Sequence, residues 1–167
     1  DEKEENGTLF INRHNQLKFG YPPSILQTNC LFEDASGNIW LGSNEGITVF
    51  PAELEDFRFL KFFFYNPENT NLENSYISDI YQDKNGKMWF ASFGGGLFKT
   101  ENDFFLGETP EFKTFSKSNK LFPTDLIYSV QEDSNGFIWC VSENMIIKHD
   151  PKKQTSETFG TMNGLNS

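Results

Sequence analysis

The chain has 167 residues, with 14 Lys and Arg against 24 Asp and Glu, which gives a formal net charge of −10. This acidic balance argues against nucleic acid and against an anionic membrane surface as partners, because both attract clustered positive charge. The hydrophobic fraction of 37%, with 19 Phe, predicts a packed core rather than a disordered tail.

One motif, Asp-x2-Gly-x2-Trp, occurs three times, with offsets of 49 and then 50 residues. The copies are Asp34, Gly37 and Trp40; Asp83, Gly86 and Trp89; and Asp133, Gly136 and Trp139. A period of about fifty residues is typical of propellers and other repeat arrays. We therefore predict an all-β chain of β-propeller blades, each built from four antiparallel strands.

In chain order, residues 7–24 are predicted to end a preceding blade, because they suggest two strands without the Asp-Gly-Trp hairpin. Blades are then predicted at 25–75, 76–125 and 126–163, and 164–167 resembles the start of another repeat. Propellers usually close with four to eight blades. We therefore expect residues 1–167 to form about three and a half blades, a partial propeller and a fragment of a larger ring, with seven blades as the expected number.

The strands are clearest in the third repeat, where they are predicted at 126–131, 137–142, 145–149 and 156–160. The Asp, the small polar residues and the Gly of the motif suit a hairpin turn in which Gly adopts a left-handed conformation. The second strands are apolar on both faces, which indicates sheets covered on both sides. Residues 51–64 leave room for a short helical turn at 51–55 but for no crossover helix, so a parallel α/β sheet is excluded.

The string from Glu33 to Ser43, followed by Gly46 and Ile47, resembles the two-component regulator propeller repeat. Residues 82–98 also match it well, whereas the third copy has Met145 in place of the glycine. The resemblance covers roughly residues 7–167.

The resemblance implies part of the ligand-sensing region of a bacterial hybrid two-component sensor, a periplasmic ectodomain of an inner-membrane protein. Such a sensor is expected to recognise an oligosaccharide and to signal to polysaccharide-utilisation genes. This chain would have no enzymatic activity, while histidine kinase activity and membrane attachment would lie elsewhere in the parent chain. The alternatives are a protein-interaction propeller without a small ligand and, less favoured, a propeller lyase or glycosidase.

The repeated motif residues have functional and structural interpretations. The turn aspartates could begin calcium loops, but such loops need a bidentate Glu at position twelve, where the second and third copies have Gly94 and Asn144. The tryptophans could be sugar platforms, but their repetition in every blade favours a core between blades. We expect neither a metal nor a cofactor.

The other candidates for chemistry are few. His149 occupies the third-strand position of Phe50 and is predicted to be a partly exposed structural histidine, because no second His shares its repeat. Cys30 and Cys140 are predicted to be buried free thiols in different blades. Loop carboxylates could serve glycoside hydrolysis, but we expect them to be solvated. They are Glu53, Glu55, Asp56, Glu101 and Asp103.

The predicted ligand contact lies on the face opposite the Asp-Gly hairpins. Its residues are Tyr65, Asn69, Asn71, Tyr76 and Phe93. Aromatic faces beside amide groups suit a polyhydroxylated ligand, although Asn and Pro in such connections also serve turn geometry.

Unpaired blade edges and uncovered apolar faces predict self-association or a homodimer. An apolar patch at Phe57, Phe59 and 62–64 would favour a protein partner, but we expect these residues to form and pack the fourth strand.

Overall fold

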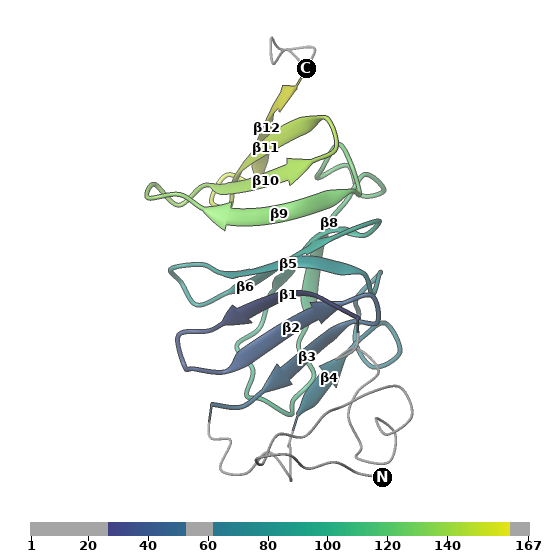
Figure 1. Cartoon of the computed structure of the whole chain (residues 1–167). Helices are drawn as coiled ribbons and strands as arrows, with labels where there is room; N and C mark the ends of the chain where they lie inside the picture. The colour runs from purple at the N-terminus through teal and green to yellow at the C-terminus, as the bar shows by residue number, and fades with distance from the viewer. Residues whose placement is uncertain (1–26, 53–61, 161–167) are drawn as a thin grey trace, which may run out of the picture.

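The computed structural model describes residues 27–52 and 62–160 (Figure 1). Strands in these ranges form three four-stranded antiparallel sheets, which confirms the predicted all-β class. The predicted partial blade at 7–24 and the repeat start at 164–167 lie outside the described residues, as do Glu53, Glu55, Asp56, Phe57 and Phe59. The described residues include no helix long and apolar enough to cross a membrane.

Each sheet is one blade whose strands follow one another in sequence order. Blade 1 consists of β1 (Thr28–Glu33), β2 (Ile39–Ser43), β3 (Ile47–Phe50) and β4 (Phe63–Tyr65). Blade 2 consists of β5 (Ile77–Gln82), β6 (Met88–Ser92), β7 (Gly96–Thr100) and β8 (Phe112–Phe115). Blade 3 consists of β9 (Ile127–Glu132), β10 (Ile138–Ser142), β11 (Met145–Asp150) and β12 (Thr155–Gly160). The strands predicted for the third repeat agree with those of blade 3 to within one residue at each end.

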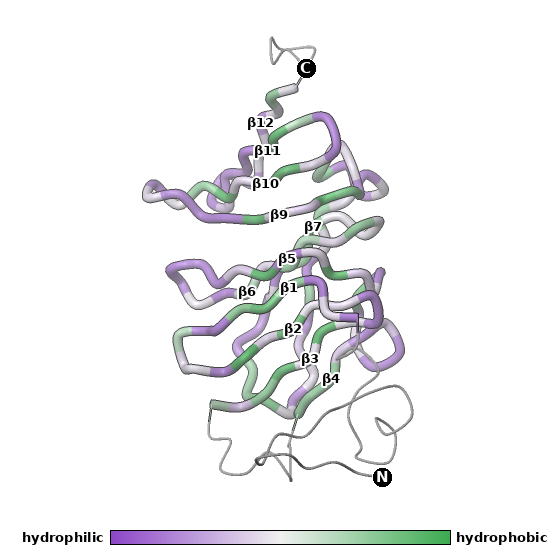
Figure 2. Tube along the Cα trace, in the orientation of Figure 1, coloured by the Kyte–Doolittle hydropathy of each residue, from purple (hydrophilic) through white to green (hydrophobic). Residues whose placement is uncertain are grey.

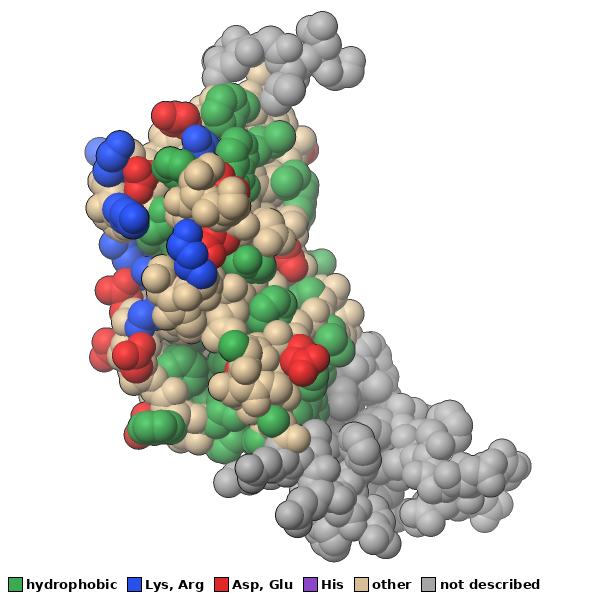
Figure 3. All heavy atoms as spheres, turned by 90° about the vertical axis from the view of Figure 1, so that its left-hand side faces the viewer, with side chains coloured by type: hydrophobic (Ala, Val, Ile, Leu, Met, Phe, Trp, Pro, Cys, Tyr) green, Lys and Arg blue, Asp and Glu red, His purple; other side chains and the backbone are tan. Residues whose placement is uncertain are grey.

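The blades lie face to face, and the innermost strands β1, β5 and β9 contact one another in that order (Figure 1). All three Asp-Gly hairpins point to one side, which we call the hairpin face. Apolar residues concentrate along the strands and polar residues at the turns (Figure 2). Seen from the hairpin face, Lys side chains gather towards one margin, with Asp and Glu side chains among them (Figure 3).

The core divides into two clusters, one in each seam between neighbouring blades. Trp40, Ile77 and Phe90 belong to the cluster between blades 1 and 2, and Trp89, Phe115 and Ile147 to the cluster between blades 2 and 3. Every residue of β6 is buried, because blade 2 is covered on both faces. The second-strand prediction is thus confirmed for this blade, whereas β10 of blade 3 has one exposed position, Val141.

The motif tryptophans differ in burial according to what covers them. Trp40 is buried against Phe90 of blade 2, at 5.8 Å between ring centroids. Trp89 is fully buried and contacts His149 of blade 3. These positions confirm the prediction of a core between blades. Trp139 requires a correction: it is only half-buried, because no described blade covers the outer face of blade 3.

Replacing Trp89 by Ala should lower the free energy of unfolding by roughly 3–5 kcal/mol, because it opens a cavity in a fully covered seam. Trp139→Ala is the matched control, with an expected loss of less than about 2 kcal/mol because this ring is half-exposed. Urea unfolding of both variants measures the difference. Equal losses would contradict the role of the seam in burying Trp89.

Candidate functional site: an aromatic ladder across two blades

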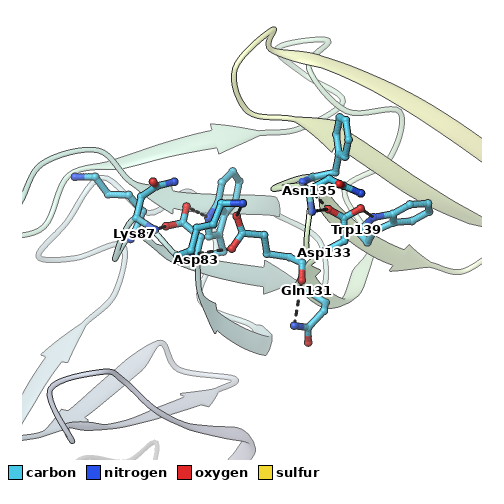
Figure 4. Close-up of polar contacts among 11 residues, drawn as sticks. Asp83, Lys87, Gln131, Asp133, Asn135 and Trp139 are labelled. Atoms are coloured by element: carbon cyan, nitrogen blue, oxygen red, sulfur yellow. Dashed lines mark hydrogen bonds and ion pairs between the residues drawn. The ribbon is translucent and has the colours of Figure 1, made fainter.

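The hairpin of each blade is closed by the carboxylate of its motif aspartate. In blade 2, Asp83 Oδ1 accepts the backbone N–H groups of Asn85 and Lys87 at 2.9 and 3.0 Å. Its Oδ2 accepts the indole N–H of Trp89 at 2.9 Å. Figure 4 shows this arrangement beside the equivalent one in blade 3, and blade 1 repeats it. The side-chain hydrogen bond from Trp139 helps to hold the pKa of Asp133 below its ordinary value.

These contacts give the motif residues structural roles in the hairpins. Gly37, Gly86 and Gly136 have φ values of 82°, 81° and 87°, which confirms the left-handed turn position that suits glycine. The turn carboxylates are engaged by N–H donors of their own hairpins. Among the described residues, no group of three or more His, Cys, Asp or Glu could hold a metal ion.

Neighbouring blades are joined by a second repeated contact. The residue before the motif aspartate reaches back to the hairpin of the preceding blade. Gln82 Oε1 accepts the N–H of Ala35 at 2.7 Å, and Glu132 Oε2 accepts the N–H of Lys84 at 2.9 Å. Each of these two hairpins is therefore fixed both within its own blade and against the next one.

A β-bulge recurs near the start of each innermost strand, and its extra residue is Asn29, Ser78 or Tyr128. In blades 1 and 2 this residue joins the blades: the Asn29 side chain donates to the Ile77 carbonyl at 2.9 Å, and Ser78 Oγ donates to the Ile127 carbonyl at 2.7 Å. The bulge residue of blade 3 is aromatic: Tyr128 stacks on Phe93 of blade 2. Because bulges re-aim side chains and are common next to active sites, this ring marks a position of interest.

Tyr128 belongs to a row of three partly exposed aromatic rings, which we call the aromatic ladder (Tyr76, Phe93 and Tyr128). Their exposed fractions are 36%, 44% and 39%. The Tyr76 and Phe93 centroids lie 5.5 Å apart, and Phe93 stacks on Tyr128 at 5.8 Å with an interplanar angle of 22°. The ladder thus crosses from blade 2 to blade 3 on the face opposite the hairpins.

The backbone holds the ladder in place. The Phe93 N–H donates to the Tyr76 carbonyl at 3.1 Å, and Phe93 forms an isolated bridge with Leu126 at the start of the third repeat. The Tyr76 N–H donates to Asn74 Oδ1 at 2.8 Å. A ligand would therefore meet rings that are already aligned, which reduces the entropy lost on binding.

A chain of amides lies on the same face at the blade 1 end. Asn29 Nδ2 donates to Asn44 Oδ1 at 2.9 Å, and Asn44 Nδ2 donates to Gln27 Oε1 at 3.2 Å. Ser75, beside Tyr76, donates to the Asn44 carbonyl at 2.9 Å. Apolar ring surface and hydrogen-bonding amides therefore share one face, as binding of a hydroxyl-rich ligand requires.

Two of the five predicted contact residues lie in the aromatic ladder, and the other three have structural roles. Tyr76 and Phe93 are in the ladder, but Tyr65 is only 5% exposed and packs on Phe104. Burial raises the pKa of Tyr65, whose hydroxyl accepts the N–H of Gly107 at 3.4 Å. The prediction for Tyr65 is therefore corrected: its ring is a core element because the β7–β8 connection covers it.

Asn69 and Asn71 also have structural partners. Asn69 Nδ2 donates to the Phe64 carbonyl at 2.7 Å. Asn71 exchanges two 2.8 Å hydrogen bonds with the backbone of Phe112. The turn-geometry explanation accounts for both side chains. Tyr128 was missed, although its departure from Asn29 and Ser78 at the same repeat position was a usable signal.

His149 differs from the prediction of partial exposure, since it is only 1% exposed. It does occupy the register position of Phe50, as predicted. Phe115 and Phe122 surround it together with Trp89, and Nδ1 lies 3.0 Å from Ser156 Oγ. Within the described part of the chain, its Nε2 has no hydrogen-bond partner. A histidine enclosed in this way is suited to a seam rather than to acid–base catalysis.

The remaining candidates have structural or solvated surroundings. Cys140 is buried and Cys30 half-buried, and both thiols are free. Burial, with a smaller effect from Asp79, raises the pKa of Cys30 to about 12 and also raises that of Cys140. Asp103 is exposed and pairs with Lys87 at 2.6 Å, which lowers its pKa.

Burial lowers the pKa of His149 from 6.5 to about 4, with nearby Asp150 opposing this and Lys113 and Lys99 adding to it. The folded state therefore keeps the ring neutral while the unfolded chain binds a proton below about pH 6.5. The free energy of unfolding should fall as the pH decreases through this window, by roughly 1.4 kcal/mol per pH unit. His149→Phe, which introduces the residue type that blade 1 has at Phe50, should remove this contribution. Urea unfolding at several pH values tests it, and an equal slope in both proteins would contradict it.

Two segments of the chain are similar to a known protein family. Residues 23–45 and 71–94 match the family described as two component regulator propeller. These segments contain the first two motif copies, and the third copy, with Met145, lies outside them. No curated protein sequence is significantly similar to the chain.

Two solved structures from B. thetaiotaomicron are similar in fold. The extracellular domain of hybrid two component system BT3049 superposes with a TM-score of 0.69 and 21% identity, over 84% of this chain and 18% of that one. The extracellular domain of hybrid two component system BT4673 gives 0.63 and 19%, over 80% of this chain and 18% of that one. The chain thus spans less than a fifth of either solved chain. The chain therefore has the fold of a partial β-propeller, and two of its segments are similar to the two component regulator propeller family.

Proposed function

We propose that the chain is part of the extracytoplasmic ligand-sensing region of a hybrid two-component sensor and that it binds an oligosaccharide. The repeats and the likeness to two extracellular domains support the sensing role. The aromatic ladder is the observation that supports an oligosaccharide as the ligand. Its aligned rings offer stacking surfaces, and the neighbouring amides offer directed hydrogen bonds. We further propose that this region lies in the periplasm and that the sensor signals to polysaccharide-utilisation genes. In this proposal the chain binds the ligand and catalyses no reaction.

The reading frame around residues 1 and 167 provides the first test. We expect an upstream secretion signal, further Asp-x2-Gly-x2-Trp repeats and a downstream membrane helix followed by a histidine kinase. A stop codon soon after Ser167 without a membrane segment would refute the sensor assignment.

Removing the rings of the ladder should weaken oligosaccharide binding. Calorimetric titration with cello-, xylo-, malto- and arabino-oligosaccharides first identifies a binding sugar. Tyr76→Ala and Tyr128→Ala should each then weaken its affinity by roughly tenfold, since each removes one stacking surface.

Phe105→Ala is the matched control, because Phe105 is an exposed aromatic residue in the β7–β8 connection, on the hairpin face. We expect unchanged affinity for this variant. Binding that survives the loss of Tyr76 and Tyr128, or that falls equally with Phe105→Ala, would exclude the ladder as the site.

A second candidate function, protein interaction, rests on the outer face of blade 3. Trp139 and Phe159 stack there at 6.0 Å, and the exposed side chain of Val141 lies on the same strand as Trp139. This surface corresponds to those that are buried in the two described seams. It is therefore suited to contact with another blade, including one from a second copy of the chain.

Val141→Lys should reduce self-association of the chain, because it places a charge on this apolar face. Light scattering over a concentration series should show a mass that increases for the wild type and stays closer to the monomer for the variant. A wild-type monomer at high concentration would contradict self-association through this face.

A further inference from the structure

A groove of about 620 Å³ runs along the outer edge of the molecule, between the connection that follows β8 in blade 2 and strand β12 of blade 3. We call it the outer groove. Its lining includes Lys117, Lys120, Phe122, Gln154, Thr155 and Ser156. The groove borders the outermost strand, whereas the aromatic ladder borders the innermost strands, so the two sites are separate.

The outer groove is basic although the chain is acidic. Lys117 and Lys120 are exposed, and no aspartate or glutamate is among the described residues that line the groove. Within residues 27–52 and 62–160, neither ammonium group forms an ion pair. Asp125 is nearby, but its Oδ1 accepts the backbone N–H of Lys117 at 2.6 Å. Two lysines without carboxylate partners, in a chain with a net charge of −10, attract an anionic group.

Polar and apolar groups complete the lining. Ser156, whose Oγ lies 3.0 Å from His149 Nδ1, and Thr158 line the groove from one face of β12. Gln154 Oε1 accepts a 2.6 Å hydrogen bond from a third ammonium group, that of Lys113. Phe122 is buried beneath and gives the groove an apolar floor. Hydroxyls and an amide beside an apolar floor suit a small organic anion better than a bare ion.

The backbone of the groove is unusual at two points. Among the described residues, Lys120 and Gln154 are the two non-glycine residues with positive φ, at 62° and 56°. Both line the outer groove. Left-handed backbone at such residues is uncommon and often found at ligand sites. Asn119 Oδ1 accepts the N–H groups of Ser116 and Leu121, both at 3.1 Å, which holds the connection in this conformation.

We propose that the outer groove binds a small hydroxyl-rich molecule bearing a carboxylate or sulfate group. Lys117 and Lys120 hold the anionic group, Ser156 and Thr158 on one face of β12 bind polar substituents, and Phe122 contacts the apolar part. This site goes beyond the proposed function, because it requires neither the aromatic ladder nor a neutral oligosaccharide.

Calorimetric titration of the full chain at low salt tests this site with three probes: D-glucuronate, D-glucose 6-sulfate and D-glucose. The first two should bind, more weakly as salt is added, and glucose should bind at least about tenfold more weakly. The two charged probes separate a carboxylate site from a sulfate site. If neither binds, or if glucose binds equally well, the proposal is overturned.

Paired variants locate the binding. Lys117→Gln with Lys120→Gln should reduce the affinity for the charged probe by about tenfold or more. Lys152→Gln with Lys153→Gln is the matched control, because it removes the same charge from the exposed β11–β12 connection, on the hairpin face. A local site predicts little change in this control. Equal losses in both pairs, or no loss in the first, would refute the outer groove, and circular dichroism checks that all variants are folded.

Discussion

The structure depends on the hydrogen bond between each motif aspartate and the tryptophan six residues later. One carboxylate closes the hairpin through two backbone N–H groups and fixes the indole through a third bond. In the first two copies the ring then projects from the second strand into the seam, where the next blade covers it. A short local motif thus determines both the turn and the packing between blades. This double role explains why Asp, Gly and Trp recur together while most residues around them vary.

Local chemistry of this kind is what a sequence reveals well. The strands of blade 3 were predicted to within one residue because turn residues and apolar runs mark them directly. Burial was harder to predict, since it depends on residues supplied by another repeat. His149 was expected to be partly exposed but is enclosed by rings from blade 2 and the following connection. Trp139 has the same local sequence context as Trp89, yet no described blade covers it.

The difference between local sequence patterns and contacts supplied by distant residues also explains why only some of the predicted contact residues lie in the candidate site. Tyr76 and Phe93 were predicted because they flank strands on the face opposite the hairpins. Tyr65 has a similar position in the chain, but the β7–β8 connection folds over it from 42 residues away. No local pattern reports that contact. Tyr128 could have been found only by aligning the bulge residues of the three innermost strands, since it departs from the amide and hydroxyl of the other two.

Both proposed binding sites span the seam between blades 2 and 3. At the ladder, Phe93 of blade 2 stacks on Tyr128 of blade 3; at the outer groove, the connection after β8 faces β12. The seam is closely packed around Trp89, and Glu132 accepts a hydrogen bond from the Lys84 N–H of the preceding hairpin. A ligand at either site therefore meets two blades already fixed relative to each other. In the proposed sensing role, a ligand transmits a signal only by favouring one arrangement over another, and we expect that change at contacts outside this packed seam.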